Sequence, residues 1–441
     1  MITIAHRIQL MPNNKQKTYF RKAIGCCRFA YNWGLAEWQR RYKEGERDMD
    51  EIKLRNAFNA IRKEQFPWTY EVSKYATAYA FTDLQTAFNN FFAHRTKYPK
   101  MHKKRDNAGT FYLGSDAVRL CDYNPRMKHL QGTTYNIKGK HQYMKVPNLG
   151  YVKTAERLRF NGKIMGIRIS QNGDKFFATF QVQISEEEYL RTHPNAAVEK
   201  HCAVGIDFGI NEVMTLSDNI AVHNPHITLK YERRIARMNR RLRKRRHART
   251  KQERLQGVKQ SNNFNKMSRR INHTQQRVAN IRRNLSQKLT TVLTTTYKAI
   301  AIEDLNVKGM MHGRNIGKSI GDVGFGELRK QIEYKAALNN VSVTVADRFY
   351  PSSKTCHACG YRHSGLERHD RYFVCPKCGY DIKRDLNAAL NLRGLIPNVG
   401  TDYPELTPAD LTALLSRFTL NGIATSKIEA GRQRKAHKAI L

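Results

Sequence analysis

The chain has 441 residues, of which 40% are hydrophobic, so it has enough material for several domains with apolar cores. Lysine and arginine (78 residues) outnumber aspartate and glutamate (37 residues), giving a formal net charge of +41. Such an excess is destabilising unless a polyanion neutralises it, so it predicts a nucleic-acid partner. The length argues against a small ribosomal-type binder, and the lack of a long apolar run argues against a membrane-embedded protein.

Residues 2–10 alternate between apolar and polar side chains and predict a strand. This opening segment lacks the apolar core and cleavage site of a signal peptide, so we expect a protein of the reducing cytoplasm. Apolar residues then recur at three- and four-residue steps over residues 20–42 and 75–92, as in amphipathic helices. These patterns predict a helical domain over residues 11–105. A basic cluster closes that domain and is a candidate nucleic-acid contact: Lys103, Lys104 and Arg105.

Residues 106–185 are rich in residue types that favour strands. Two strand-like runs flank Asn172-Gly173, a pair typical of a tight hairpin turn. We expect the strand within residues 1–10 to join this sheet, which makes the helical domain an insertion into a β-barrel. The acidic and irregular segment 186–199 predicts a linker.

The apolar run AVGIDFGI opens a third domain, which we expect to extend over residues 200–395. Within residues 230–297 two helices are predicted, each with an apolar seam, and an antiparallel hairpin would bury both seams. No acidic residue interrupts the arginines between Arg233 and Arg249, which favours phosphate contact over a merely solvated helix face. The nucleic-acid-binding candidates on this hairpin are Arg240, Arg241, Arg245 and Arg246.

Four of the eight cysteines form two Cys-x-x-Cys pairs: Cys356, Cys359, Cys375 and Cys378. Fifteen residues separate the pairs, a spacing typical of a structural zinc site with four thiolate ligands and no open coordination position. Two redox dithiols are the alternative, which the ribbon-like spacing disfavours. The other cysteines lack this spacing and are expected to be small buried side chains: Cys26, Cys27, Cys121 and Cys202.

Three acidic residues lie at the ends of apolar segments. Asp207 follows the run AVGI, Glu303 follows AIAI, and Asp385 lies at the polar start of the helix-like stretch RDLNAALNL. An acid at the end of a buried strand is costly unless it binds something, and converging carboxylates suit Mg²⁺. Taken one at a time, each acid is more simply a surface or capping residue.

The chain resembles the TnpB family of transposon-encoded RNA-guided nucleases, relatives of CRISPR type V effectors, over most of its length to about residue 395. The most specific segments are GIDFGI, AIEDLNV, SIGDVGFGELRKQIEYKAA, YPSSKTCHACG, CPKCG and RDLNAALN. By this resemblance Asp207, Glu303 and Asp385 occupy the three RuvC positions and hold two Mg²⁺ ions. The zinc ribbon, over residues 350–382, lies between the second and third acids. Many members carry His-Asp where this chain has Ile382-Lys383, so a further acid beside Asp385 is not carried over.

The resemblance implies an α+β multidomain fold. Its parts are an OB-like β-barrel (wedge) with an inserted helical recognition domain, an RNase H-like RuvC domain with a helical insertion, and a zinc ribbon with four cysteine ligands. The implied partners are a guide RNA and a double-stranded target DNA with a short adjacent motif, and no membrane. Lys74 matches a motif-contacting position. The implied location is the bacterial or archaeal cytoplasm, associated with the nucleoid.

Residues 396–441 are weakly patterned, with one predicted helix near residues 408–420 and a basic end, and we expect this tail to be mobile. The leading functional hypothesis is a transposon-associated RNA-guided DNA endonuclease with a single two-metal site. A CRISPR-adopted type V-like miniature effector is a close variant. An RNA-guided DNA-binding repressor is a second class, which loss of one RuvC acid would mark, and all three acids are present. A strand-joining transposase is a third class, for which no residue stands out.

Overall fold

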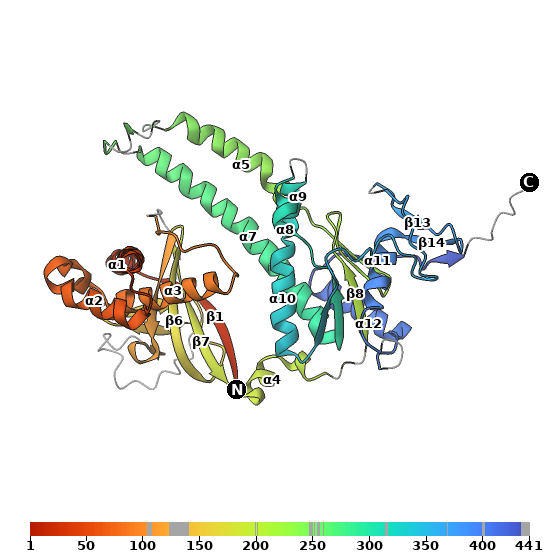
Figure 1. The fold of residues 1–441 in the computed structure, drawn as a ribbon, viewed down its shortest axis with the longest axis horizontal. Coiled ribbons are helices and arrows are strands. Elements are labelled where there is room, and N and C mark those ends of the chain that lie inside the picture. Colours follow the sequence, from red (N-terminus) through yellow and green to blue (C-terminus); the bar gives the residue numbers. More distant parts are fainter. Residues whose placement is uncertain are drawn as a thin grey trace, which may run out of the picture. The chain divides into compact units, whose positions relative to one another are not determined.

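The computed structural model divides into two compact units, Met1–Thr192 and His193–Leu441, which are described separately (Figure 1). Lys104 and Arg105, two of the nucleic-acid-binding candidates, lie outside the described residues. Among the helices that are described, none combines the length and apolar character needed to cross a membrane. The structure describes residues 1–103, 108–122, 141–198, 200, 202–246, 250, 252–253, 256–258, 260–313, 316–367, 369–398 and 402–433.

The first unit contains a seven-stranded antiparallel sheet whose first strand lies in its middle. The strand β1 (Ile2–Met11) pairs with β7 (Lys175–Ile184) on one side and with β5 (Gly150–Thr154) on the other. The hairpin between β6 and β7 turns at Gly173, whose φ of 63° favours glycine. Across the sheet the order is β2 (Ala108–Gly114), β6 (Lys163–Asn172), β7, β1, β5, β4 (Tyr143–Val146) and β3 (Arg119–Cys121).

Three helices lie between β1 and β2 in the chain: α1 (Asn14–Lys43), α2 (Glu51–Gln65) and α3 (Lys74–Phe92). Asn13 and Gln16 form a reciprocal capping box at the start of α1. The helices pack through aromatic side chains, and Trp38 of α1 stacks on Phe88 of α3 with ring centroids 4.0 Å apart. Short 3-10 turns, η1 (Pro67–Glu71) and η2 (Ser115–Ala117), complete this part.

The acidic segment expected to be an irregular linker begins with a helix, α4 (Glu186–Thr192). Three glutamates occupy its first turn, where they complement the helix dipole, and Tyr189 is buried. A 3-10 turn, η4 (Pro194–Ala196), follows at the start of the second unit.

The second unit is built on a six-stranded mixed sheet. The strands β8 (Ala203–Asp207), β9 (Glu212–Leu216) and β10 (Ile220–His223) form an antiparallel meander. On the other side of β8, β11 (Ala299–Ile302) and β12 (Ser342–Val345) run parallel to it. The order is β12, β11, β8, β9, β10 and β15 (Thr425–Lys427). The helices are α5 (Ile227–Lys244), α7 (Asn262–Thr296), α8 (Val307–Met311), α9 (Gly317–Val323), α10 (Phe325–Leu338), α11 (Arg384–Arg393) and α12 (Pro408–Leu420).

The two faces of this sheet differ in side-chain size. Val204 and Ile206 of β8 face a large apolar core that also contains residues of α7, α10 and α12. The intervening positions carry small residues, Ala203 and Gly205 on β8 and Ala299 and Ala301 on β11. Since strand side chains alternate between faces, these small residues share one face, and α11 packs there.

The C-terminal segment expected to be mobile is instead packed as far as it is described. Leu414 and Phe418 of α12 are buried in the main core, β15 pairs with β10, and β16 (Arg432–Gln433) pairs with β14 (Tyr380–Lys383). The prediction of a mobile tail is therefore wrong over residues 402–433. The short strands β15 and β16 pair with strands that are distant in the sequence, and no periodicity within them could signal that pairing.

Candidate metal-binding sites

The strand pairing brings Asp207 and Glu303 to one edge of the sheet. Asp207 is the last residue of β8, and Glu303 directly follows β11, which runs parallel to β8 with Ile302 opposite Ile206. Both acids continue the small-residue pattern of their strands, so both lie on the face covered by α11. The two carboxylates therefore lie at the same edge and on the same face of the sheet.

The third acid, Asp385, is the second residue of α11 and reaches the same edge because that helix lies very close to β8. A Cβ atom added to Gly205 would lie 1.9 Å from the carbonyl oxygen of Ala389 and 2.4 Å from the backbone nitrogen of Arg393. Only glycine permits this approach. Gly205 thus fixes the depth at which α11 packs, and with it the position of Asp385.

We expect Gly205→Ala to push α11 off the sheet, because the added methyl group would overlap the helix backbone. Overpacking of this kind costs about 1–3 kcal/mol of the free energy of unfolding, and the shift of Asp385 should also lower activity. Thermal unfolding of the purified variant measures the loss of stability. The control is Gly326→Ala on α10, where no atom lies within 4 Å of the added Cβ. Equal melting temperatures for the two variants would contradict this role for Gly205.

The three carboxylates line one open groove of about 1400 Å³. Burial, followed by the nearby charges of Glu303 and Asp385, raises the pKa of Asp207 well above its ordinary value. Burial also raises the pKa of Glu303, while a hydrogen bond from Ser352 opposes that rise. Like charges held in a partly buried site favour protons or a cation, so the groove is suited to a divalent ion.

Of the two neighbouring acids Glu303 and Asp304, only Glu303 lines the groove. Asp304 forms ion pairs with Arg329 and, at 2.6 Å, with Arg348. These hydrogen bonds, that of Arg329 first, lower the pKa of Asp304. Asp304 is therefore held in ion pairs with two arginines, whereas Glu303 lines the groove.

The other walls of the groove differ in chemistry. The segment that surrounds the cysteine pairs contributes one acidic side chain, Glu367, and a majority of basic ones: Lys354, His369, Arg371, Lys383 and Arg384. Apolar side chains come from the residues after β8 and from the region of α8, α9 and α10: Phe208, Ile210, Met310, Ile316 and Phe325. A polyanionic strand can therefore lie with its phosphates against the basic wall and its bases against the apolar wall.

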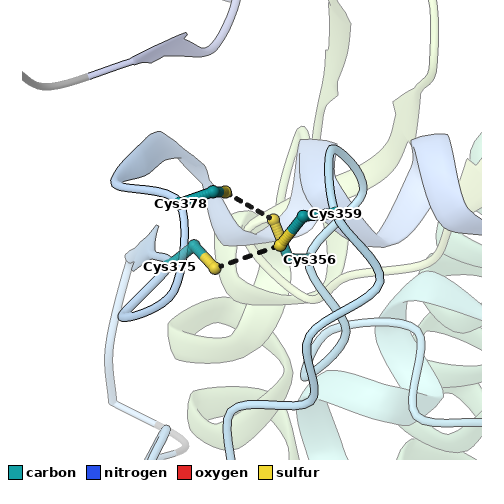
Figure 2. A group of neighbouring side chains, drawn as sticks. All are labelled: Cys356, Cys359, Cys375 and Cys378. Atoms are coloured by element: carbon teal, nitrogen blue, oxygen red, sulfur yellow. Dashed lines mark hydrogen bonds between the residues drawn. The ribbon is translucent and has the colours of Figure 1, made fainter.

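The four cysteines of the two pairs gather at one point (Figure 2). Their sulfur atoms all lie within 4.8 Å of one another, with Cys356 and Cys378 3.7 Å apart and Cys359 and Cys375 3.6 Å apart. A tetrahedral zinc ion with Zn–S bonds of about 2.3 Å separates its sulfur ligands by about 3.8 Å. The cysteine cluster therefore fits a zinc ion with four thiolate ligands.

The two cysteine pairs sit in turns of the same geometry. Gly360 donates its N–H to the carbonyl oxygen of Cys356, and Gly379 does the same to Cys375, each at 2.9 Å. Both glycines have φ near 70°. The strands β13 (Tyr372–Val374) and β14 support the second turn.

Within the described part of the chain, only these cysteines bring three or more ligand atoms of His, Cys, Asp or Glu within 4.8 Å of one another.

The nucleic-acid-binding candidates that are described are exposed but lie in different units. Lys74 is at the start of α3 and Lys103 follows the helices of the first unit. Arg240 and Arg241 lie on α5, which packs along α7, and Arg245 and Arg246 follow it (Figure 1). Each unit therefore carries exposed basic residues of its own.

Sequence patterns did not single out Ser352, Asn387 or Asn391, although each contacts the surroundings of the two candidate sites. The two asparagines are four residues apart in the helix-like stretch NAALN, so they share one face of α11. Buried asparagines repeated at that spacing are the signal that could have identified them.

Family models match three parts of the chain: "Helix-turn-helix domain" over residues 1–47, "Probable transposase" over residues 180–314, and "Cas12f1-like, TNB domain" over residues 325–392. The first matched segment holds one strand and one long helix here, β1 and α1.

Two named relatives align with most of the chain. One, from Escherichia coli (strain K12), is called "Putative RNA-guided DNA endonuclease InsQ" and is 26% identical, covering 88% of this chain and 91% of the relative. A Streptomyces pristinaespiralis protein, "Putative RNA-guided DNA endonuclease", is 28% identical, with 88% of each chain covered. Among solved structures, the mini-RNA-guided endonuclease CRISPR-Cas_phi3 aligns with a TM-score of 0.44 at 9% identity, over 89% of this chain and 92% of that chain.

The fold and the two sites define a class of protein, an α+β chain of two units with an acidic groove beside a four-cysteine cluster. Within that class these matches confirm the resemblance to the TnpB proteins of transposons.

Proposed function

We propose that this protein is an RNA-guided DNA endonuclease, associated with a transposon, that cleaves double-stranded DNA beside a short adjacent motif. The observation that carries the proposal is the meeting of Asp207, Glu303 and Asp385 in one groove with a basic wall. The names of the relatives support the guided reaction. All three acids are present, which favours a nuclease over a guided repressor.

The second unit is then an RNase H-like RuvC domain, in which three antiparallel strands are followed by two parallel ones and the catalytic acids lie at one sheet edge. The α5–α7 hairpin is its helical insertion. In the first unit, the sheet is the wedge and the helices between β1 and β2 are the recognition domain. Lys74 and the exposed arginines of α5 are proposed to contact nucleic-acid phosphates or bases.

Two Mg²⁺ ions, when bound, would supply an activated water and stabilise the leaving 3′ oxygen of the scissile phosphate, so that products carry 5′-phosphates. Asp207 lies on the central strand and is proposed to contact both ions. Glu303 and Asp385 would each hold one ion. The basic wall would hold the phosphates on either side of the scissile bond.

Only one such groove is proposed, so the two DNA strands would be cut in turn, each as a single strand. An R-loop supplies single strands of this kind, because the guide RNA pairs with the target strand and displaces the other. The four cysteines are proposed to hold one structural zinc ion, which leaves no open position for catalysis.

The metal requirement tests the proposed reaction. Excess EDTA should stop guided cleavage of a plasmid, and added Mg²⁺ should restore it. The ion competes with protons for Asp207 and Glu303, whose raised pKa values keep the acid form present at higher pH. Raising the pH from 6 to 8 should therefore lower the Mg²⁺ concentration needed for half-maximal cleavage, by up to about tenfold per pH unit for each proton displaced.

The direction of these pKa shifts also predicts how the stability of the metal-free protein changes with pH. An acid with a raised pKa in the folded protein stabilises the fold at low pH, and that contribution is lost as the pH rises through the raised pKa. Without divalent ions the groove is therefore a source of instability at high pH, and Mg²⁺ should raise the melting temperature more at pH 8 than at pH 6. Cleavage that persists in excess EDTA would refute the proposed reaction.

A further inference from the structure

We propose that Ser352, Asn387 and Asn391 form a clasp that couples the cysteine cluster to the carboxylate groove, so that zinc at one site strengthens divalent-ion binding at the other. The inference rests on the proposed function. It assigns these three as positioning residues, which act through the metal ligands and not on the substrate.

The first link joins the segment before the cysteines to Glu303. The hydroxyl of Ser352 donates a hydrogen bond to Oε1 of Glu303 at 2.6 Å, and Ser352 is only 4% exposed. A buried hydroxyl with a single short bond to a carboxylate fixes the rotamer of that carboxylate. Glu303 therefore holds its position in the groove through Ser352.

The second link joins the same segment to α11, which carries Asp385. The side-chain N–H group of Asn391 donates to the carbonyl oxygens of Ser352 and Thr355, both at 2.7 Å. The amide of Asn387 donates to Thr355 at 2.6 Å and accepts from the backbone N–H of His357 at 3.0 Å. Both asparagines are buried, at 0% and 8% exposed, so losing these bonds would leave buried polar groups unpaired.

The third link is the cysteine turn itself. Cys356 lies between Thr355 and His357, the two residues that Asn387 contacts. The turn is closed by the bonds from Cys356 N–H to the oxygen of Tyr361 (2.8 Å) and from Gly360 N–H to the oxygen of Cys356 (2.9 Å). A zinc ion that fixes Cys356 would hold this turn, and the asparagines would transmit its position to α11.

From one short segment, Ser352–His357, the clasp therefore contacts the carboxylate of Glu303 and the helix α11 that carries Asp385. The hydroxyl of Ser352 bonds to Glu303, and the carbonyl oxygens of Ser352 and Thr355 accept bonds from the asparagines of α11. Because these contacts share a single rigid turn, order at the cysteine cluster and order at the groove are thermodynamically linked. Linkage of this kind is reciprocal, so ions in the groove should also slow the loss of zinc.

Binding of Mn²⁺ to the purified zinc-loaded protein, measured by electron paramagnetic resonance, tests the clasp without any cleavage assay. Asp207→Asn supplies the background of nonspecific sites. Ser352→Ala should weaken Mn²⁺ binding by roughly five- to tenfold, a usual range for coupled sites, while keeping one zinc per chain. Asn387→Ala should weaken Mn²⁺ binding and also speed the transfer of zinc to a chromogenic chelator.

The matched control is Ser364→Ala, which alters an exposed serine of the same ribbon and should change neither quantity. Reciprocity is tested by adding saturating Mg²⁺, which should slow zinc transfer from the wild type and not from Ser352→Ala. If Asn387→Ala does not fold, the Mn²⁺ affinity of Ser352→Ala decides by itself whether the clasp exists. Wild-type Mn²⁺ affinity in Ser352→Ala, with zinc retained, would overturn the clasp.

The coupling between the two sites and the proposed nuclease function can be refuted independently of each other. A wild type that binds Mn²⁺ in the groove but never cleaves guided DNA would refute the nuclease and leave the coupling intact. A wild type that cleaves guided DNA, together with Ser352→Ala at full Mn²⁺ affinity, would refute the coupling and leave the nuclease intact.

Discussion

Replacing Asp207 with alanine should abolish guided cleavage, by a factor of about 10³ or more, while guided DNA binding stays near that of the wild type. Asp207 ends β8, which lies between β11 and β9 in the sheet, and its loss removes the carboxylate that is proposed to contact both ions. Binding depends on base pairing with the guide and on basic surfaces, none of which includes Asp207. A time course of plasmid cleavage measures the first effect, and a gel-shift assay with target DNA measures the second.

The control for Asp207→Ala is Asp48→Ala, which removes an exposed acid of the first unit whose side chain is 92% exposed. It should cleave as the wild type does. Residual cutting by Asp207→Ala within tenfold of the wild type would refute the assignment of the site. Equal loss of binding and cleavage would show instead that the substitution damages the fold.

The second large effect is expected at the cysteine cluster. Cys375→Ser should release zinc, unfold the ribbon and abolish cleavage, because the cysteine side chain is 1% exposed and is packed with Phe373 and Ile382. In small zinc domains the metal-binding free energy, about 10–16 kcal/mol in zinc-finger peptides, is also folding free energy. The ribbon leads directly into α11 and Asp385, so its unfolding reaches the groove.

Metal analysis of the purified protein measures this effect. The wild type should carry one zinc per chain, and Cys375→Ser well below that. Cys121→Ser, which alters a cysteine outside the cluster, should keep its zinc and its activity. An active wild-type preparation with far less than one zinc per chain would contradict the zinc assignment.

Much of the site could be predicted because its residues end recognisable elements. Asp207 and Glu303 each follow a short apolar run, and the strands of such runs place their ends at a common edge when they are parallel. The cysteine spacing likewise predicts a cluster of thiols without any knowledge of the fold. These signals are local, so a single sequence is enough to carry them.

The remaining features depend on contacts between distant segments. Gly205 matters only because α11, which begins 179 residues later at Arg384, packs against it. The bond from Ser352 to Glu303 spans 49 residues and leaves no periodic trace. The order of the C-terminal segment could not be predicted for the same reason. Its helix α12 packs in the core, and its strand β15 pairs with β10.

In the proposed function an RNA, and not the protein, chooses the DNA sequence that is cut. The most direct measurement is to exchange the variable 3′ portion of the bound RNA and to score cleavage of two plasmids that share the adjacent motif. In a guided complex a heteroduplex of about 20 base pairs reads the sequence, and the protein itself reads only the short adjacent motif. We predict that cleavage moves to the plasmid matching the new RNA. Cleavage that stays at the old sequence and ignores the new one would show that the protein reads DNA directly, and would refute the RNA-guided function.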